Sequence, residues 1–159
     1  MEIVLGVALF PLVAVAMEGV AYLTHRYVMH GLLWSLHRDH HRPKGRGWQR
    51  NDLFALFFAT VSFLLILSGT LRASPPLIGA GAGMALYGVG YTLFHDVMFH
   101  KRLRRVRLRP STPYLRRIYD AHARHHRSNR KDNGVSFGFL YARAPRPAPA
   151  QARGQGGRS

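Results

Sequence analysis

The sequence of 159 residues contains no cysteine. This absence excludes disulfides, thiolate zinc sites, iron–sulfur ligation and cysteine nucleophiles, so that any bound metal would be held mainly by imidazole nitrogen. Acidic residues are also scarce, because Asp and Glu together number 7 and the glutamates are Glu2 and Glu18 alone. A soluble carboxylate-bridged dimetal bundle needs Glu-x-x-His pairs. Neither glutamate belongs to such a pair, which excludes that kind of site.

Basic residues are missing from the first 24 positions, although the net charge is +16. Long apolar runs cover residues 3–23, 53–71 and 77–94. The first of them would form about 30 Å of helix, enough to cross a bilayer. If all three runs span, 22 of the 23 Lys and Arg residues lie on one side, in residues 25–52 and 95–159. This asymmetry predicts that side to be cytoplasmic, and it explains the charge without a nucleic-acid partner.

The length fits a single domain. The sequence therefore predicts an all-α polytopic membrane protein of about three helices, with four as the alternative. Residues 1–141 would form the membrane domain with a cytoplasmic helical cap, and residues 142–159 a disordered basic tail. Gly79 and Gly83 in the third run have the spacing of close helix contacts, with a groove for an apolar ligand as the alternative.

All ten histidines fall in two blocks that share one pattern, H-x4-H followed by H-x2-H-H. The first block contains His25, His30, His37, His40 and His41, and the second contains His95, His100, His122, His125 and His126. A single histidine is usually a hydrogen-bonded structural residue. Ten that repeat in order on one membrane face indicate metal ligands, because neutral imidazole binds iron, zinc, copper or nickel.

Within each H-x2-H-H group the three side chains share one face of a helix. The H-x4-H pairs are harder to place, since five residues of α-helix turn by about 140°; a helix end near each pair would solve this, and Gly31 is a plausible stop. Ten imidazoles exceed the coordination of one metal. Two metals with about five ligands each are therefore expected.

Three acidic residues lie close to these blocks. Asp39 and Asp96 are candidates for orienting histidine rings, with helix-terminus carboxylates as the alternative. Glu18 lies within the first apolar run, where an ionisable group is costly unless it faces protein or water. It is expected either to line a pocket beside the metals or to be a hydrogen-bonded packing residue.

Basic residues crowd the segment 101–117, which is predicted to contact anionic lipid, with docking of an acidic redox partner as a second role. A helix is predicted to begin at residues 111–113 and to continue to His126. A histidine-rich site at the end of apolar helices favours oxygen activation on an apolar substrate.

Several motifs together resemble the bacterial β-carotene 3-hydroxylases of the fatty acid hydroxylase superfamily. They are M-E at residues 17–18, H-R-Y-V-M-H-G at 25–31, the box ending at His41, N-D-L at 51–53, the box at 95–100 and V-S-F-G-F-L-Y at 135–141. The resemblance covers about residues 17–142.

The resemblance implies a non-haem di-iron monooxygenase that uses O2 and two Fe2+ ions to hydroxylate carbon 3 of the β-ionone rings of β-carotene, giving β-cryptoxanthin and zeaxanthin. Ketocarotenoids are further candidate substrates. It implies that all ten histidines are ligands and that electrons come from ferredoxin or NAD(P)H, at the bacterial inner membrane. The alternatives are a lipid or sterol hydroxylase or desaturase with the same boxes, and a membrane metal-binding protein without enzymatic activity.

Overall fold

The computed structural model describes residues 1–43, 45, 47–128, 130–131 and 135–143. Within this part of the chain all regular structure is helical. The elements in order are α1 (Glu2–Leu23), the π-helix η1 (Thr24–Leu32), α2 (Trp34–His41), α3 (Asp52–Leu71), α4 (Pro75–Tyr91), the π-helix η2 (Thr92–Phe99) and α5 (Pro113–His125). The all-α prediction is thereby confirmed.

Three helices are long and apolar enough to cross a membrane: Glu2–Leu32, Asp52–Leu71 and Pro75–Phe99. The chain is thus a multi-pass membrane protein, with three such helices rather than four among the described residues. The first and third are longer than the apolar runs, because α1 continues into η1 and α4 into η2 without a break. The polar ends of the two helices therefore carry the first histidines of each block.

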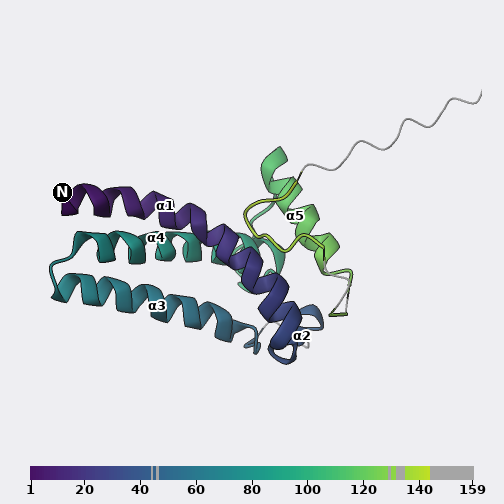
Figure 1. Cartoon of the computed structure of the whole chain (residues 1–159). Helices are drawn as coiled ribbons and strands as arrows, with labels where there is room; N and C mark the ends of the chain where they lie inside the picture. Colours follow the sequence, from purple (N-terminus) through teal and green to yellow (C-terminus); the bar gives the residue numbers. More distant parts are fainter. Residues whose placement is uncertain (44, 46, 129, 132–134, 144–159) are drawn as a thin grey trace, which may run out of the picture.

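Glycine allows α4 to pack closely against both of its neighbours. A methyl group on Gly79 would overlap the carbonyl oxygen of Gly6 in α1, and one on Gly83 would overlap that of Phe10. On the other side of α4, a methyl group on Gly81 would lie 2.9 Å from the carbonyl oxygen of Ser62 in α3. The close helix contacts predicted for Gly79 and Gly83 are confirmed, and α4 lies between α1 and α3 (Figure 1).

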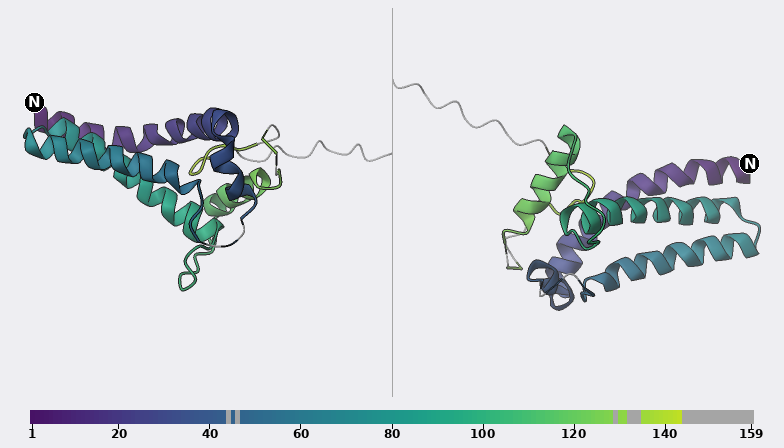
Figure 2. Two further views of the ribbon diagram at one scale, coloured as in Figure 1. Left: turned by 90° about the horizontal axis from the view of Figure 1, so that it is seen from below. Right: turned by 180° about the vertical axis from the view of Figure 1, so that it is seen from behind.

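Both histidine blocks lie at the same end of this bundle. The N-terminus and the turn between α3 and α4 lie at the opposite end, whereas α2 and α5 pack across the histidine end (Figures 1 and 2). The turn joins α3 and α4 as an antiparallel hairpin (Figure 1). Helix α5 begins close to the predicted position, because the Thr112 hydroxyl accepts a hydrogen bond from Leu115 N and caps it.

The C-terminal segment of the described chain folds back onto the bundle. Phe139 is buried with Met17, Ala21 and Tyr87. Ala142 is buried against Ile118 and Ala121 of α5. The tail predicted from residue 142 lies, from residue 144 onward, outside the described residues.

Candidate metal centre

The H-x4-H pairs are brought together by π-helices. A π-helix closes its hydrogen bonds between residues five apart, as from Leu33 N to Val28 O at 2.8 Å and from His100 N to His95 O at 3.0 Å. Residues five apart therefore lie in neighbouring turns, on nearly the same side of the helix. The ring centroids of His25 and His30 are 5.2 Å apart, and those of His95 and His100 are 4.6 Å apart. Within η1, Gly31 is the residue whose dihedral angles are not helical, and it directly follows His30.

All ten histidines gather in one cluster, which contains two sets of convergent nitrogen atoms. In each set one nitrogen of every member lies within 4.8 Å of the others. The first set is His25, His30, His37, His41 and His125, and the second is His40, His100, His122 and His126. His95 adjoins the second set, since its Nε2 lies 3.1 Å from that of His40. The division fits the expected two sites of about five histidines.

The sets do not coincide with the sequence blocks, because each block gives one histidine to the other set. His40 of the first block joins the second set, and His125 of the second block joins the first. Each is the middle member of its H-x2-H-H group. On a helix, the side chains of residues i and i+4 project in nearly the same direction, whereas that of residue i+3 is turned to the opposite side of residue i. The convergence expected within each group is therefore divided between two neighbouring sites.

Outer partners fix the orientation of most rings. Nδ1 donates to a backbone carbonyl in four cases: from His25 to Phe137 O at 2.9 Å, His30 to Lys131 O at 3.1 Å, His41 to Ser128 O at 2.9 Å and His125 to Val135 O at 2.9 Å. Side-chain acceptors serve three more, namely Asn51 Oδ1 for His37 at 2.6 Å, Gln49 Oε1 for His40 at 3.0 Å and Asp96 Oδ1 for His95 at 2.8 Å. Such partners select the tautomer whose Nε2 is free to bind a metal.

The inward nitrogens fit a bound cation. A backbone carbonyl can only accept, so His25, His30, His41 and His125 carry their proton on Nδ1 and leave a bare lone pair on Nε2. The Nε2 atoms of His30 and His125, and of His41 and His30, are nevertheless 3.1 Å apart. Facing lone pairs repel unless a cation lies between them. Nitrogens bound about 2.1 Å from one metal are about 3.0 to 3.4 Å apart, which matches this spacing.

The second set contains two buried ring nitrogens without partners, one of which supports the same conclusion. His122 Nδ1 and His126 Nε2 are buried without a hydrogen-bond partner. A buried polar atom without a partner costs about 1–3 kcal/mol. A metal bound at His126 Nε2 would remove that cost for this ring, whereas His122 faces His100 with its Nε2, at 3.0 Å from His100 Nε2. The donor set therefore fits a pair of metal ions.

Burial keeps the imidazoles neutral. Outside the spanning helices, desolvation lowers the pKa of His40 and His125 to about 4 and that of His41 to about 3. Desolvation also lowers the pKa of His37 and His100 to about 2, with a further decrease from neighbouring histidines. Neutral imidazole is the form that binds metals, so the rings are ready to act as ligands at neutral pH.

The two aspartates near the blocks have different partners. Asp96 accepts from the ring of His95, as described, which is the contact that the predicted orienting role would require. Asp39 instead accepts from Arg50 N at 2.7 Å and lies in the last turn of α2, a position that corresponds to the alternative of a helix-terminus carboxylate. Arg102, predicted as part of a lipid-facing surface, points inward and contacts both carboxylate oxygens of Asp52 at 2.6 Å. That part of the basic-surface prediction is wrong, because Arg102 is partly buried in an ion pair with Asp52.

Glu18 does not face the histidines. Its Oε1 accepts from the backbone nitrogens of Phe139 and Tyr141, both at 2.9 Å. Its Oε2 accepts from the Tyr87 hydroxyl at 2.7 Å. The described residues that line the adjacent cavity include Met17 but not Glu18. This geometry is that of the hydrogen-bonded alternative.

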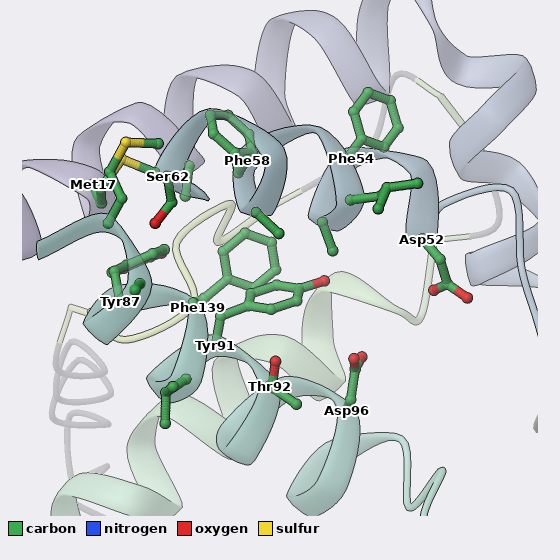
Figure 3. A pocket seen from close by; sticks show the side chains of 18 of the residues that line it. Met17, Asp52, Phe54, Phe58, Ser62, Tyr87, Tyr91, Thr92, Asp96 and Phe139 are labelled. Carbon is green, nitrogen blue, oxygen red and sulfur yellow. The ribbon is translucent and has the colours of Figure 1, made fainter. Parts of the chain in front are cut away.

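An apolar cavity of about 870 Å³ lies next to the histidine cluster. One wall is α3 and another is the second half of α4, with Met17 and Ala21 of α1 behind them. Figure 3 shows the rings of Tyr91 and Phe139 close together in this cavity, with Asp52 and Asp96 toward one end. The Phe139 ring stacks on His25 with centroids 5.0 Å apart, and the Tyr91 ring stacks on His95 at 4.5 Å. Two aromatic rings therefore separate the cavity from the centre.

Sequence reasoning identified the histidines but assigned no role to Gln49 and Asn51, although N-D-L is part of the resemblance. Their proximity to the boxes was the available signal. The carbonyl acceptors of residues 128, 131, 135 and 137 have no side-chain signature, so no residue pattern could reveal them.

The fatty acid hydroxylase family matches residues 10–142. Among curated proteins, the beta-carotene hydroxylase of Pseudescherichia vulneris is 44% identical over 91% of this chain and 81% of its own length. That of Pantoea ananas is 44% identical over 80% of this chain and 72% of its own. Beta-carotene 3-hydroxylase 2 of Arabidopsis thaliana, a chloroplastic protein, is 38% identical over 80% of this chain and 42% of its own. No solved structure matches. The matched segment contains all ten histidines, and the chain belongs to the fatty acid hydroxylase family.

Proposed function

We propose that this protein is a β-carotene 3-hydroxylase that uses two iron ions held by the histidine cluster. The observation that carries the proposal is the pair of buried imidazole sets beside an apolar cavity between membrane helices. Relatives named beta-carotene hydroxylase, at up to 44% identity, support a carotenoid as the substrate. The number 3 in the name of the Arabidopsis relative supports ring carbon 3 as the position of attack.

The first histidine set would hold one iron ion and the second set, with His95, the other. The iron pair supplies the activation of O2, which protein side chains cannot perform. In the overall reaction a C–H bond, O2, two electrons and two protons give an alcohol and water. The chain contributes fixed ligand orientation through the Nδ1 partners and a cavity wall that excludes water from the oxidising centre.

The cavity supports delivery of the substrate from the bilayer. Its walls carry Phe54, Phe58 and Met84, which suit a polyene, and Tyr91 and Phe139 lie where the cavity meets the histidines. A β-ionone ring that reaches the metals would have to pass or displace these two rings. We therefore expect the polyene to lie along α3 and α4 with its ring against Tyr91 and Phe139.

The electron donor would dock at the histidine end. Lys101, Arg104, Arg105, Arg107 and Arg109 are exposed there, on the connection between η2 and α5. Exposed positive charge attracts an acidic partner of the ferredoxin type and anionic lipid headgroups alike. The excess of basic residues at this end favours the cytoplasmic side of a bacterial inner membrane.

Expression in bacteria that accumulate β-carotene, followed by chromatography of the pigments, tests the proposal. The wild type is expected to convert β-carotene to β-cryptoxanthin and zeaxanthin. The variants His40→Ala and His125→Ala should insert into the membrane at normal levels and give neither product. Unchanged β-carotene with the wild type, in cells that contain a working ferredoxin and reductase, would refute the proposal.

The same cells distinguish the alternatives. The family description favours a lipid hydroxylase as the second candidate, and that activity would give hydroxylated fatty acids or sterols in place of zeaxanthin. A metal-binding protein without oxygen chemistry would load metal and leave both pigments and lipids unchanged.

A further inference from the structure

We infer that Glu18 is a positioning residue for the first histidine set, acting through the segment of residues 135–141. The inference rests on the proposed function, since it concerns the same metal centre. Glu18 lies on α1, whereas the segment follows α5 and folds back between α1, α4 and α5. Hydrogen bonds tie the carboxylate to the segment, and the segment in turn holds two of the five rings.

The carboxylate gathers four donors. Oε1 accepts from Phe139 N and Tyr141 N at 2.9 Å, and both oxygens lie 3.1 Å from Leu140 N. The Tyr87 hydroxyl of α4 donates to Oε2 at 2.7 Å. Successive backbone N–H groups around one anion form the kind of concave site that binds a fixed negative charge. A half-buried carboxylate in a membrane helix thereby gains partners that offset its desolvation.

The same segment orients two ligand rings. Phe137 O accepts from His25 Nδ1, and Val135 O accepts from His125 Nδ1, each at 2.9 Å. The Phe139 ring stacks on His25 with an interplanar angle of 11°. His25 and His125 both belong to the first set. Within the described residues, no hydrogen bond joins residues 135–141 to a Nδ1 atom of the second set, where Gln49 and Asp96 accept from His40 and His95. The Phe139 ring meets the His95 ring edge-on, with centroids 5.2 Å apart.

Because the hydrogen bonds from Nδ1 atoms to residues 135–141 come from the first set, loss of Glu18 should weaken the binding of one metal ion more than that of the other. Without the carboxylate, the peptide groups of residues 139–141 lose their acceptor, and the segment keeps only its packing contacts with α1 and α4. His25 and His125 then lose the partners that fix tautomer and ring orientation, and the loss of such partners weakens metal binding by about 10- to 100-fold. The second set keeps its own partners. One of the two metal ions should therefore be lost before the other.

A substitution at Gly138 would disturb the same contact between Glu18 and the segment, with the change made in the segment instead of in Glu18. A methyl group there would lie 2.7 Å from both Glu18 Oε1 and Tyr141 O. The variant Gly138→Ala therefore displaces the segment from Glu18 while the carboxylate remains. Ser62 provides a control, because its hydroxyl makes a buried hydrogen bond between membrane helices, to Gly81 O at 2.8 Å, and does not involve the backbone of residues 135–141.

The experiment compares the full-length wild type with Glu18→Ala, Glu18→Gln, Gly138→Ala and Ser62→Ala, each purified in detergent and loaded with Fe2+. Metal analysis should give about two ions per chain for the wild type and Ser62→Ala, and about one for Glu18→Ala and Gly138→Ala. Glu18→Gln keeps one acceptor oxygen and should fall between them. Mössbauer spectra of 57Fe should show the loss of one iron environment and retention of the other.

Hydrogen exchange of residues 135–141 in the metal-free proteins is measured in parallel. The exchange should be faster in Glu18→Ala and Gly138→Ala than in the wild type and Ser62→Ala. Unchanged exchange, or faster exchange with two ions and unaltered spectra, would overturn the positioning role. A wild type that loads no iron would count against the proposed function alone, since the metal-free exchange still decides whether Glu18 holds the segment.

Discussion

The Nε2 atoms of His30 and His125 lie 3.1 Å apart, although 95 positions separate them in the sequence. His125 is the member of the second block that joins the first set, as His40 is the member of the first block that joins the second. The chain thus contains a repeat whose two copies exchange one ligand each. Neither copy can complete a site alone, so the two sites form together.

Double variants can test this exchange. His37→Ala with His40→Ala removes two neighbours on α2 that belong to different sets, and should abolish both metal ions. His40→Ala with His126→Ala removes two members of one set, and should leave about one ion per chain. Metal analysis of the purified proteins measures the difference. The reverse result, with one ion retained in the first pair, would mean that each block binds its own metal.

The outer partner of His95 gives a second prediction. Asp96→Asn keeps an oxygen near Nδ1 but removes the charge, and should weaken binding of one metal by about 10- to 100-fold in a competition titration with a chelator. Asp39→Asn is the matched control, because Asp39 bonds Arg50 N and no ring. Its metal affinity should stay within about threefold of the wild type. Equal effects of the two variants would contradict the role of Asp96.

Metal-free protein should lose stability in mild acid. The pKa of His40 and His125 is lowered to about 4 in the folded chain from an ordinary value of 6.5. Below pH 6.5 the unfolded chain takes up protons that the folded chain refuses, so the free energy of unfolding falls between about pH 6.5 and 4. Each of these histidines contributes at most about 1.4 kcal/mol per pH unit. Thermal unfolding of chelator-treated protein at pH 7.5 and 5.5 measures this, and equal midpoints would contradict it.

The close contact of α1 with α4 predicts a large cost for added volume. Gly79→Val places a side chain against the Gly6 carbonyl and should destabilise the protein by about 1–3 kcal/mol. Gly88→Ala, in the same helix, meets nothing within 4 Å. It should be neutral or stabilising by about 1 kcal/mol, since alanine favours helix. The free energy of unfolding of both variants is measured in detergent. Similar values for the two would contradict the close contact between α1 and α4 at Gly79.

Filling the cavity should reduce turnover while leaving the metals bound. Ala59 lines the cavity on α3 and lies in a helix that carries no histidine. Ala59→Trp occupies space that the polyene would use, and should lower zeaxanthin formation by at least about tenfold, equivalent to about 1.4 kcal/mol. Metal content should match the wild type. Undiminished conversion would place the substrate elsewhere.

The sequence predicted the spans and the histidine cluster because both depend on local composition. Apolar run length defines a spanning helix, and ten histidines in two repeated blocks leave few other interpretations. The contact between the His25 and His30 rings could not be predicted, because no residue pattern shows that α1 continues as a π-helix. The backbone partners of Glu18 could not be derived either, because these amides lie more than a hundred positions away.

The glycine contacts of α4 also limit how the walls of the cavity can move. Gly79 and Gly83 hold α4 against α1, and these two helices continue into the π-helices that carry His25, His30 and His95. Helix α3 forms the opposite wall and contributes no histidine. Helix α3 is held to α4 as well, because Gly81 packs against Ser62 and the Ser62 hydroxyl donates to Gly81 O. Exchange of one carotenoid for the next would then depend on the side chains of the cavity rather than on separation of these helices.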